Sequence, residues 1–241
     1  MSDNSELELA LKDLVIANRI LGHEGVLDGF GHISIRHPSN PERYFMAGSR
    51  SPELVTRHDL IEYHLDSRPI DQNGRAMYAE RQIHGSIYQA RPEVRAVCHN
   101  HAHDLIPFGV TGTTLQPVMH MASVIGDEVP IWDIADEFGD TDLLVTDPAK
   151  GASLARCLGP RRVALMRGHG AVVAGRGLRE AVYVAIYLHL NAELVLKAKS
   201  LGEVKYLSPG EAKACAETLL SELSQNRAWE YWSARAGYSG V

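Results

Sequence analysis

The stretch from Glu80 to His101, ERQIHGSIYQARPEVRAVCHNH, joins a predicted helix to a predicted strand. Its first half is typical of an amphipathic helix, because Ile83, Ile87 and Ala90 recur at the spacing of one helical face. Arg91-Pro92 then breaks the pattern, since a helix rarely continues through the residue before a proline. The sequence therefore predicts a helix over about residues 80–90.

The second half of the stretch, Val94–His101, is predicted to form a strand. Strand side chains alternate between two faces, so His99 and His101 point one way and Cys98 points the other way. Two imidazoles at this spacing lie side by side and are able to share a metal ion. Cys98 is expected in the core on the opposite face.

The composition sets limits on the class of protein. At 241 residues the chain can bury a full core as one domain, and we expect a single domain over residues 1–241. With 22% charged residues and a net charge of −6, the chain has no basic surplus for binding nucleic acid. It has no run of 18 apolar residues and no basic-then-apolar leader, so we expect a cytoplasmic protein without a membrane partner. Cys98, Cys157 and Cys215 are widely spaced and odd in number, which favours reduced thiols.

Apolar patterns, turns and helix caps along the chain predict an α/β fold with a mixed or antiparallel sheet. Asp147-Pro148 is a strong helix start, and Ser208 with Glu211 forms a capping box that begins the last predicted helix. The remaining predicted helices cover residues 5–21 and 178–201, and the predicted strands cover residues 32–36, 44–47, 60–65, 129–133, 163–166 and 171–174.

His169 is a third candidate for the metal site. It stands between Gly168 and Gly170, where two apolar strand segments meet and the backbone is free to turn sharply. Three neutral imidazoles bind a divalent ion and leave coordination positions open, as a catalytic site requires. Glu80 is then a fourth ligand or a general acid or base. By spacing alone, ordinary polar or hydrogen-bonded histidines remain an equal alternative.

Several ordered motifs resemble those of the class II aldolase/adducin family across nearly the whole chain. The motifs are Gly31-His32-x-Ser34-x-Arg36, Glu80-Arg81-x-x-His84, Arg91-Pro92, Ala96-Val97-x-His99-Asn100-His101 and Gly168-His169-Gly170. The resemblance implies a three-layer α/β/α sandwich with a central mixed, mainly antiparallel sheet. It also implies homotetramers with active sites at subunit interfaces.

In the enzymes of this family a divalent metal ion is held by three histidines. Carried over by position, the resemblance implies one ion per subunit on His99, His101 and His169, with Glu80 as the acid/base catalyst. Three imidazoles accept manganese, zinc, iron or cobalt, so the sequence does not select the metal.

The loops that grip phosphate in the sugar-phosphate aldolases of the family differ here. Small hydroxyl and amide donors are largely replaced by His32, Arg50 and Tyr78. Arginine favours pairing with a planar carboxylate, and tyrosine or histidine can lie against an aromatic ring. The pattern resembles the branch of decarboxylases that act on hydroxylated aromatic or heteroaromatic dicarboxylates, such as a dihydroxyphthalate or 3-hydroxy-2-methylpyridine-4,5-dicarboxylate. The candidate substrate-binding residues are His32, Ser49, Arg50 and His120.

The resemblance leaves two other function classes open. A class II aldolase would act on a sugar phosphate or another hydroxy-keto substrate, and an adducin-like interaction module would bind no metal. The three retained histidines favour an enzyme with a small carboxylate substrate. His84 is either close to the site or packed against the sheet, and His103 is expected at the surface. Trp229, Tyr231 and Trp232 either pack in the core or close a neighbouring subunit's site.

Overall fold

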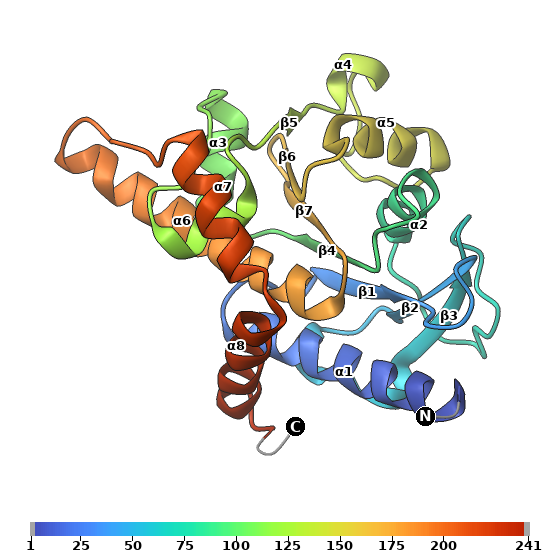
Figure 1. The fold of residues 1–241 in the computed structure, drawn as a ribbon. Coiled ribbons are helices and arrows are strands. Elements are labelled where there is room, and N and C mark those ends of the chain that lie inside the picture. Colours follow the sequence, from blue (N-terminus) through green and yellow to red (C-terminus); the bar gives the residue numbers. More distant parts are fainter. Residues whose placement is uncertain (1–2, 239–241) are drawn as a thin grey trace.

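The computed structural model describes residues 3–238, which form a seven-stranded sheet with helices on both faces (Figure 1). The strand order is β3-β2-β1-β4-β7-β6-β5, and every neighbouring pair is antiparallel except β5 with β6. The strands are β1 (His32–Arg36), β2 (Arg43–Ala47), β3 (Leu60–His64), β4 (Ala96–Asn100), β5 (Ile131–Trp132), β6 (Val163–Met166) and β7 (Gly170–Gly175). The sheet is therefore mixed and mainly antiparallel, as the resemblance implies.

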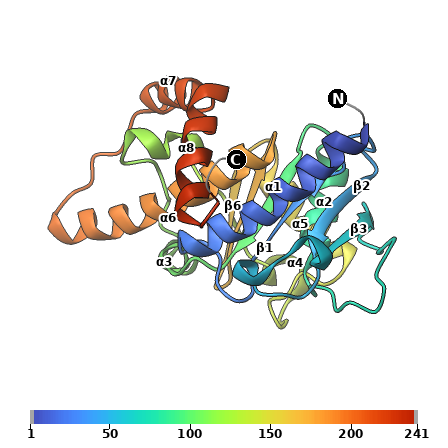
Figure 2. The ribbon, with the colours of Figure 1, turned by 90° about the horizontal axis from the view of Figure 1, so that it is seen from below.

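Two groups of helices cover the sheet. On one face α1, α6 and α8 pack against one another, with α1 on β1 and α6 on β4 and β7. On the other face α2 packs on β4 and on α5, and α5 reaches β5 and β6 (Figures 1 and 2). The helices are α1 (Asp3–His23), α2 (Arg81–Ala90), α3 (Ile106–Thr111), α4 (Ala135–Phe138), α5 (Pro148–Leu158), α6 (Leu178–Leu201), α7 (Pro209–Leu219) and α8 (Glu222–Arg235). The three layers confirm the α/β/α sandwich.

Helix α6 is long and apolar enough to cross a membrane by length and composition alone. In this fold it is the central helix of its layer, because it contacts α1, α8 and the middle strands of the sheet. Over half of its most apolar window is buried inside the protein. Its apolar character is thus accounted for by the core.

Some element boundaries differ from those that the sequence predicts. The last predicted helix is two helices, because the Ser221 hydroxyl caps the backbone N–H of Ser224 and starts α8. Strand β4 ends at Asn100, so His101 lies just beyond the strand. The predicted strand at residues 129–133 shortens to β5. The caps at Asp147 and Ser208 are confirmed, since each side chain accepts hydrogen bonds from backbone N–H groups of its helix.

The centre of the sheet brings distant parts of the chain together. In the antiparallel pair of β1 and β4, His32 lies opposite His99, and cross-strand partners share a face of the sheet. Strand β7 begins at Gly170, where a Cβ atom would lie only 1.9 Å from the backbone oxygen of Asn100. The preceding turn contains Gly168 at φ +65°, a left-handed conformation that glycine adopts without strain. These glycines place His169 beside the end of β4.

Candidate active site

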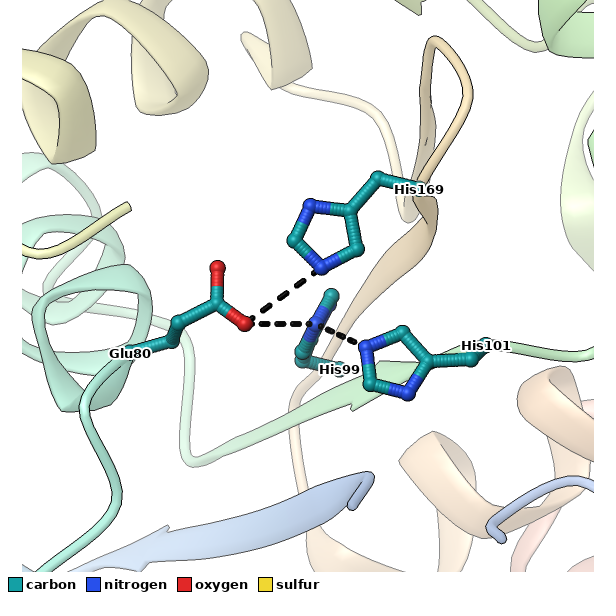
Figure 3. A group of neighbouring side chains, drawn as sticks. All are labelled: Glu80, His99, His101 and His169. Atoms are coloured by element: carbon teal, nitrogen blue, oxygen red, sulfur yellow. Dashed lines mark hydrogen bonds and ion pairs between the residues drawn. The ribbon is translucent and has the colours of Figure 1, made fainter. Parts of the chain in front are cut away.

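Four side chains from separate segments converge beside the central strands (Figure 3). Glu80 precedes the first residue of α2, His99 lies in β4, His101 follows that strand, and His169 lies in the turn between β6 and β7. One ligand atom from each residue falls within 4.8 Å of the others. The structure therefore brings together the four residues that the sequence singles out for metal binding and acid/base chemistry.

The inner atoms of this cluster face one another closely. The Nε2 atoms of His99 and His101 are 3.0 Å apart. Oε2 of Glu80 lies 3.5 Å from Nε2 of His99 and 3.3 Å from Nε2 of His169. His99 is fully buried and Glu80 nearly so, which puts the polar atoms in surroundings of low dielectric constant.

In each of the three clustered histidines, Nδ1 points away from the cluster and has an oxygen atom as its acceptor. Nδ1 of His99 donates to the backbone oxygen of Ala171 over 3.1 Å, and Nδ1 of His169 donates to that of Leu143 over 3.0 Å. Nδ1 of His101 lies 3.4 Å from Oδ1 of Asp28. When Nδ1 carries the proton, the lone pair of a neutral imidazole is on Nε2. Three such lone pairs converge, so this donor set fits a divalent transition ion.

Asp28 is a site residue that the sequence analysis missed. Its carboxylate accepts hydrogen bonds from the backbone N–H groups of Phe30 and Gly31 as well as facing His101. Burial raises the pKa of Asp28, but these bonds outweigh burial and the net pKa is lowered. The pattern Asp-x-x-Gly just before a strand signals a local side-chain turn, yet only the fold shows that the same carboxylate reaches a histidine.

A loop before α5 supplies backbone groups that no sequence motif announces. Leu143 has φ +65°, an uncommon left-handed conformation for a residue with a side chain, and its carbonyl holds His169. Two residues later, the backbone N–H of Val145 donates to Oε1 of Glu80 over 2.9 Å. The loop thereby fixes two of the four clustered side chains.

The charges in the cluster depend on one another. Burial raises the pKa of Glu80, but hydrogen bonds with His169 and His99 outweigh it and hold the pKa well below the usual range. Burial lowers the pKa of His169, and the Glu80 carboxylate reverses this to leave the pKa raised. Burial and the neighbouring imidazoles lower the pKa of His101 to about 4. Glu80 is therefore a carboxylate, and His101 is neutral, at neutral pH.

The cluster opens into a cavity of about 460 Å³. Three of the four predicted substrate-binding residues, His32, Ser49 and Arg50, line it together with Glu80, His101 and His169. Its remaining lining includes Phe30, Met77, Tyr78 and Leu144, which give it apolar and aromatic walls. The cavity thus combines a cation, an aromatic surface and a set of metal ligands.

Arg50 and Tyr78 are held on the wall of this cavity. Nε of Arg50 donates to the backbone oxygen of Leu54 over 2.9 Å and lies 3.5 Å from Oδ2 of Asp59, while the side chain stays half exposed. The Tyr78 hydroxyl donates to the backbone oxygen of Arg50, and burial raises the pKa of Tyr78 to about 12. The Tyr78 ring lies 4.5 Å from that of His32, centre to centre. Both rings are therefore fixed beside the space that a substrate would fill.

His120 is not part of this cavity. It lines a separate cavity of about 590 Å³ with Tyr183, Tyr187 and Trp232. Within one chain, therefore, the structure does not bring His120 to the other predicted substrate-binding residues.

The other histidines and aromatic residues have clear places. His84 is fully buried against the sheet and hydrogen-bonds to His32, so it satisfies both alternatives for its position. His103 is exposed, as expected. Trp229 and Trp232 are buried, whereas Tyr231 is exposed beside the His120 cavity. All three cysteines are free thiols, and Cys98 is buried as predicted.

Comparisons with known proteins agree with these features. The model of the class II aldolase and adducin N-terminal domain matches residues 12–196. The decarboxylase tropJ of Talaromyces stipitatus is 33% identical, with 99% of this chain and 98% of that protein covered. The 3,4-dihydroxyphthalate decarboxylase of Arthrobacter keyseri is 26% identical, with coverage of 94% and 93%.

The fold also resembles that of solved structures. The L-fuculose 1-phosphate aldolase from Glaciozyma antarctica PI12 superposes with a TM-score of 0.80 at 23% identity, covering 98% of this chain and 91% of that one. At this identity the likeness concerns the fold alone. With a matching family model and a relative that spans nearly its whole length, the chain belongs to the class II aldolase and adducin family.

Proposed function

We propose that this protein is a metal-dependent decarboxylase of a hydroxylated aromatic or heteroaromatic dicarboxylate, such as a dihydroxyphthalate or 3-hydroxy-2-methylpyridine-4,5-dicarboxylate. The observation that carries the proposal is the cavity, because Arg50 and the aromatic wall share it with Glu80, His101 and His169. A guanidinium pairs well with a planar carboxylate, and the apolar walls suit a ring. The decarboxylase relatives support the same reaction class.

The three imidazoles would hold the metal ion through Nε2, since each Nδ1 is already directed at an oxygen atom. When bound, the ion supplies Lewis acidity that stabilises negative charge developing on the substrate. The identity of the ion is left open by the donor set, which suits manganese, zinc, iron and cobalt.

The side chains of the cavity then divide the remaining work. Arg50 pairs with the carboxylate that the substrate keeps, and His32 binds a further oxygen. The carbon–carbon bond to the departing carboxylate breaks, carbon dioxide leaves, and the electron pair stays on the ring carbon. Glu80 carries a proton from water to that carbon through Oε2, since Oε1 is held by the backbone N–H of Val145.

The proposal extends to the assembly and its location. We infer a single domain over residues 1–241 that forms a cytoplasmic homotetramer, as the family resemblance implies. In such an assembly His120 would serve the site of a neighbouring subunit, because it lines a different cavity of its own chain. Light scattering of the purified protein tests the tetramer, and a monomer with full activity would contradict it.

A panel of substrates tests the reaction. We expect the metal-loaded protein to release carbon dioxide from hydroxyphthalates or hydroxypyridine dicarboxylates and to leave sugar phosphates intact. Cleavage of a sugar phosphate, with no carbon dioxide released from any dicarboxylate, would instead establish the aldolase alternative. A phthalate without a hydroxyl group is the matched control, because it offers Arg50 the same carboxylates without the ring oxygen.

A further inference from the structure

Behind the cavity, a buried row of hydrogen bonds runs from helix α2 to the cavity wall. The Tyr88 hydroxyl lies 2.8 Å from Oγ of Ser34, and that oxygen lies 2.6 Å from Nδ1 of His84. Nε2 of His84 is 2.7 Å from Nδ1 of His32, which lines the cavity. All four side chains are at most 2% exposed. This row is called the Tyr88–His32 chain below.

The direction of the first bond follows from the surroundings of Tyr88. Burial raises the pKa of Tyr88, so the hydroxyl keeps its proton. Among residues 3–238, Ser34 is the one acceptor within hydrogen-bond reach of that proton. A buried hydroxyl proton left without an acceptor is costly, so Tyr88 donates to Ser34.

The remaining directions follow in order. Because the Ser34 oxygen accepts a hydrogen bond from Tyr88, the Ser34 hydroxyl donates its own hydrogen bond to Nδ1 of His84. The proton of a neutral His84 is then on Nε2, which donates to Nδ1 of His32. Burial lowers the pKa of His84 to about 3, which keeps it neutral. With Nδ1 accepting, the ring proton of a neutral His32 is on Nε2.

We propose that His32 is a fixed hydrogen-bond donor in the cavity, oriented by the one-way Tyr88–His32 chain, and that it binds an anionic oxygen of the ligand and not the metal ion. No described residue accepts from Nε2 of His32, although its ring lines the cavity. The identity of the oxygen, a carboxylate or ring hydroxyl of the dicarboxylate, rests on the proposed function.

The direction of the hydrogen bonds in the Tyr88–His32 chain also distinguishes His32 from the proposed metal ligands. Its ring centre is only 5.2 Å from that of His99, so distance alone would allow a fourth imidazole in the cluster. A ring nitrogen that carries a proton has no free lone pair for a metal. His99, His101 and His169 instead direct Nδ1 at an oxygen atom, so with a metal ion bound their protons would be on Nδ1 and Nε2 would be free to bind the ion. In the metal-loaded protein the two sets of histidines would thus have opposite tautomers.

Nuclear magnetic resonance tests the direction without any substrate. In the zinc-loaded protein labelled with ¹⁵N in its histidines, we expect the shared proton on Nε2 of His84, coupled across the hydrogen bond to Nδ1 of His32. We expect Nε2 of His32 to be protonated, with its signal assigned by loss in His32→Gln. A bare Nε2 on His32, or a proton on its Nδ1, would overturn the proposal. This result is independent of whether the protein releases carbon dioxide.

Two substitutions of His84, used as a pair, test its positioning role. His84→Leu removes the donor to His32, and we expect KM for the dicarboxylate to rise about 10-fold or more, with kcat changed much less. His84→Gln retains an amide donor and should restore most of the affinity. Equal KM values for wild type and the folded leucine variant would overturn the proposal. Ser123→Ala is the control, because it removes a buried hydroxyl that is not part of the Tyr88–His32 chain. It shows whether loss of any buried polar group raises KM. If His84→Leu fails to fold, the resonance experiment on the wild-type protein still decides.

Discussion

The two carboxylate oxygens of Glu80 have different contacts. Oε1 accepts a hydrogen bond from the backbone N–H of Val145, and Oε2 lies beside the imidazoles of His99 and His169. In Glu80→Gln the amide oxygen can still accept from Val145, but the side chain no longer carries a proton. We expect turnover to fall by about 100-fold or more while the bound metal is retained. Steady-state rates and metal analysis on the same preparation measure both effects, and a fully active variant would refute the proton-carrying role.

Substitutions of His99 and His103 distinguish the loss of a metal ligand from the general effect of replacing a histidine. His99 is fully buried and faces His101 and Glu80, whereas His103 is exposed and outside the cluster. We expect His99→Ala to lose most of its metal and its activity, because one of three ligands is gone. His103→Ala should retain both. Stoichiometric metal in His99→Ala, measured by atomic absorption, would show that the ligand set is wrong.

We expect metal binding to depend on pH through His169. Its pKa is raised in the metal-free protein, because the Glu80 carboxylate stabilises the protonated imidazole. That stabilisation of the folded state is present below the ordinary pKa of histidine and is lost as pH rises through the raised pKa. A metal ion needs the lone pair of Nε2, so binding must displace the proton.

We therefore expect the affinity for the metal to increase with pH, by up to about tenfold per pH unit, until His169 is neutral. Competition titrations against a chelator across this range measure the dependence. An affinity that is constant with pH would contradict the protonation of His169 in the metal-free state.

At the level of elements, the close contact between β4 and β7 positions the candidate metal-binding residues. A Cβ on Gly170 would meet the backbone oxygen of Asn100 at 1.9 Å, and this oxygen cannot move without shifting β4. We expect Gly170→Ala to lower the free energy of unfolding by about 1–3 kcal/mol and to weaken metal binding. Gly210→Ala, at an exposed helical position with space for a methyl group, is the control. Equal denaturant midpoints for the two variants would contradict the account.

The sequence predicts elements well where the signal is local. Asp147-Pro148 and the Ser208 capping box mark helix starts through bonds within one turn, and the structure confirms both. The break at Ser221 was missed, because helical periodicity continues on both sides of a single capping serine. The predicted strand over residues 129–133 is present only as the two residues of β5, at the edge of the sheet beyond β6.

The site itself was predictable only in part. His99, His101, His169 and Glu80 belong to short motifs, and the resemblance assigns their roles. The groups that orient these side chains belong to no motif. The acceptor for His169, for example, is the backbone carbonyl of Leu143, and every residue has such a carbonyl. Contacts of this type depend on loop conformation, which sequence patterns do not report.

Across the whole molecule, the sheet order explains how residues from separate regions meet. Strand β4 lies between β1 and β7, so His99 has the β1 segment on one side and the turn before β7 on the other. Helix α2 packs on β4 (Figure 1). Glu80 immediately precedes this helix, and His84 lies within it. One small area of the fold therefore collects the metal-binding candidates, including the proposed proton carrier Glu80, and the buried chain that we propose orients His32.

We propose that the cluster of three histidines and Glu80 carries out a metal-dependent decarboxylation. The most direct measurement is the carbon dioxide released from a dihydroxyphthalate by the protein as purified, after removal of metal by a chelator, and after a divalent ion is restored. We predict release by the first, loss in the second and recovery in the third. Release that continues unchanged in the metal-free protein would contradict the account.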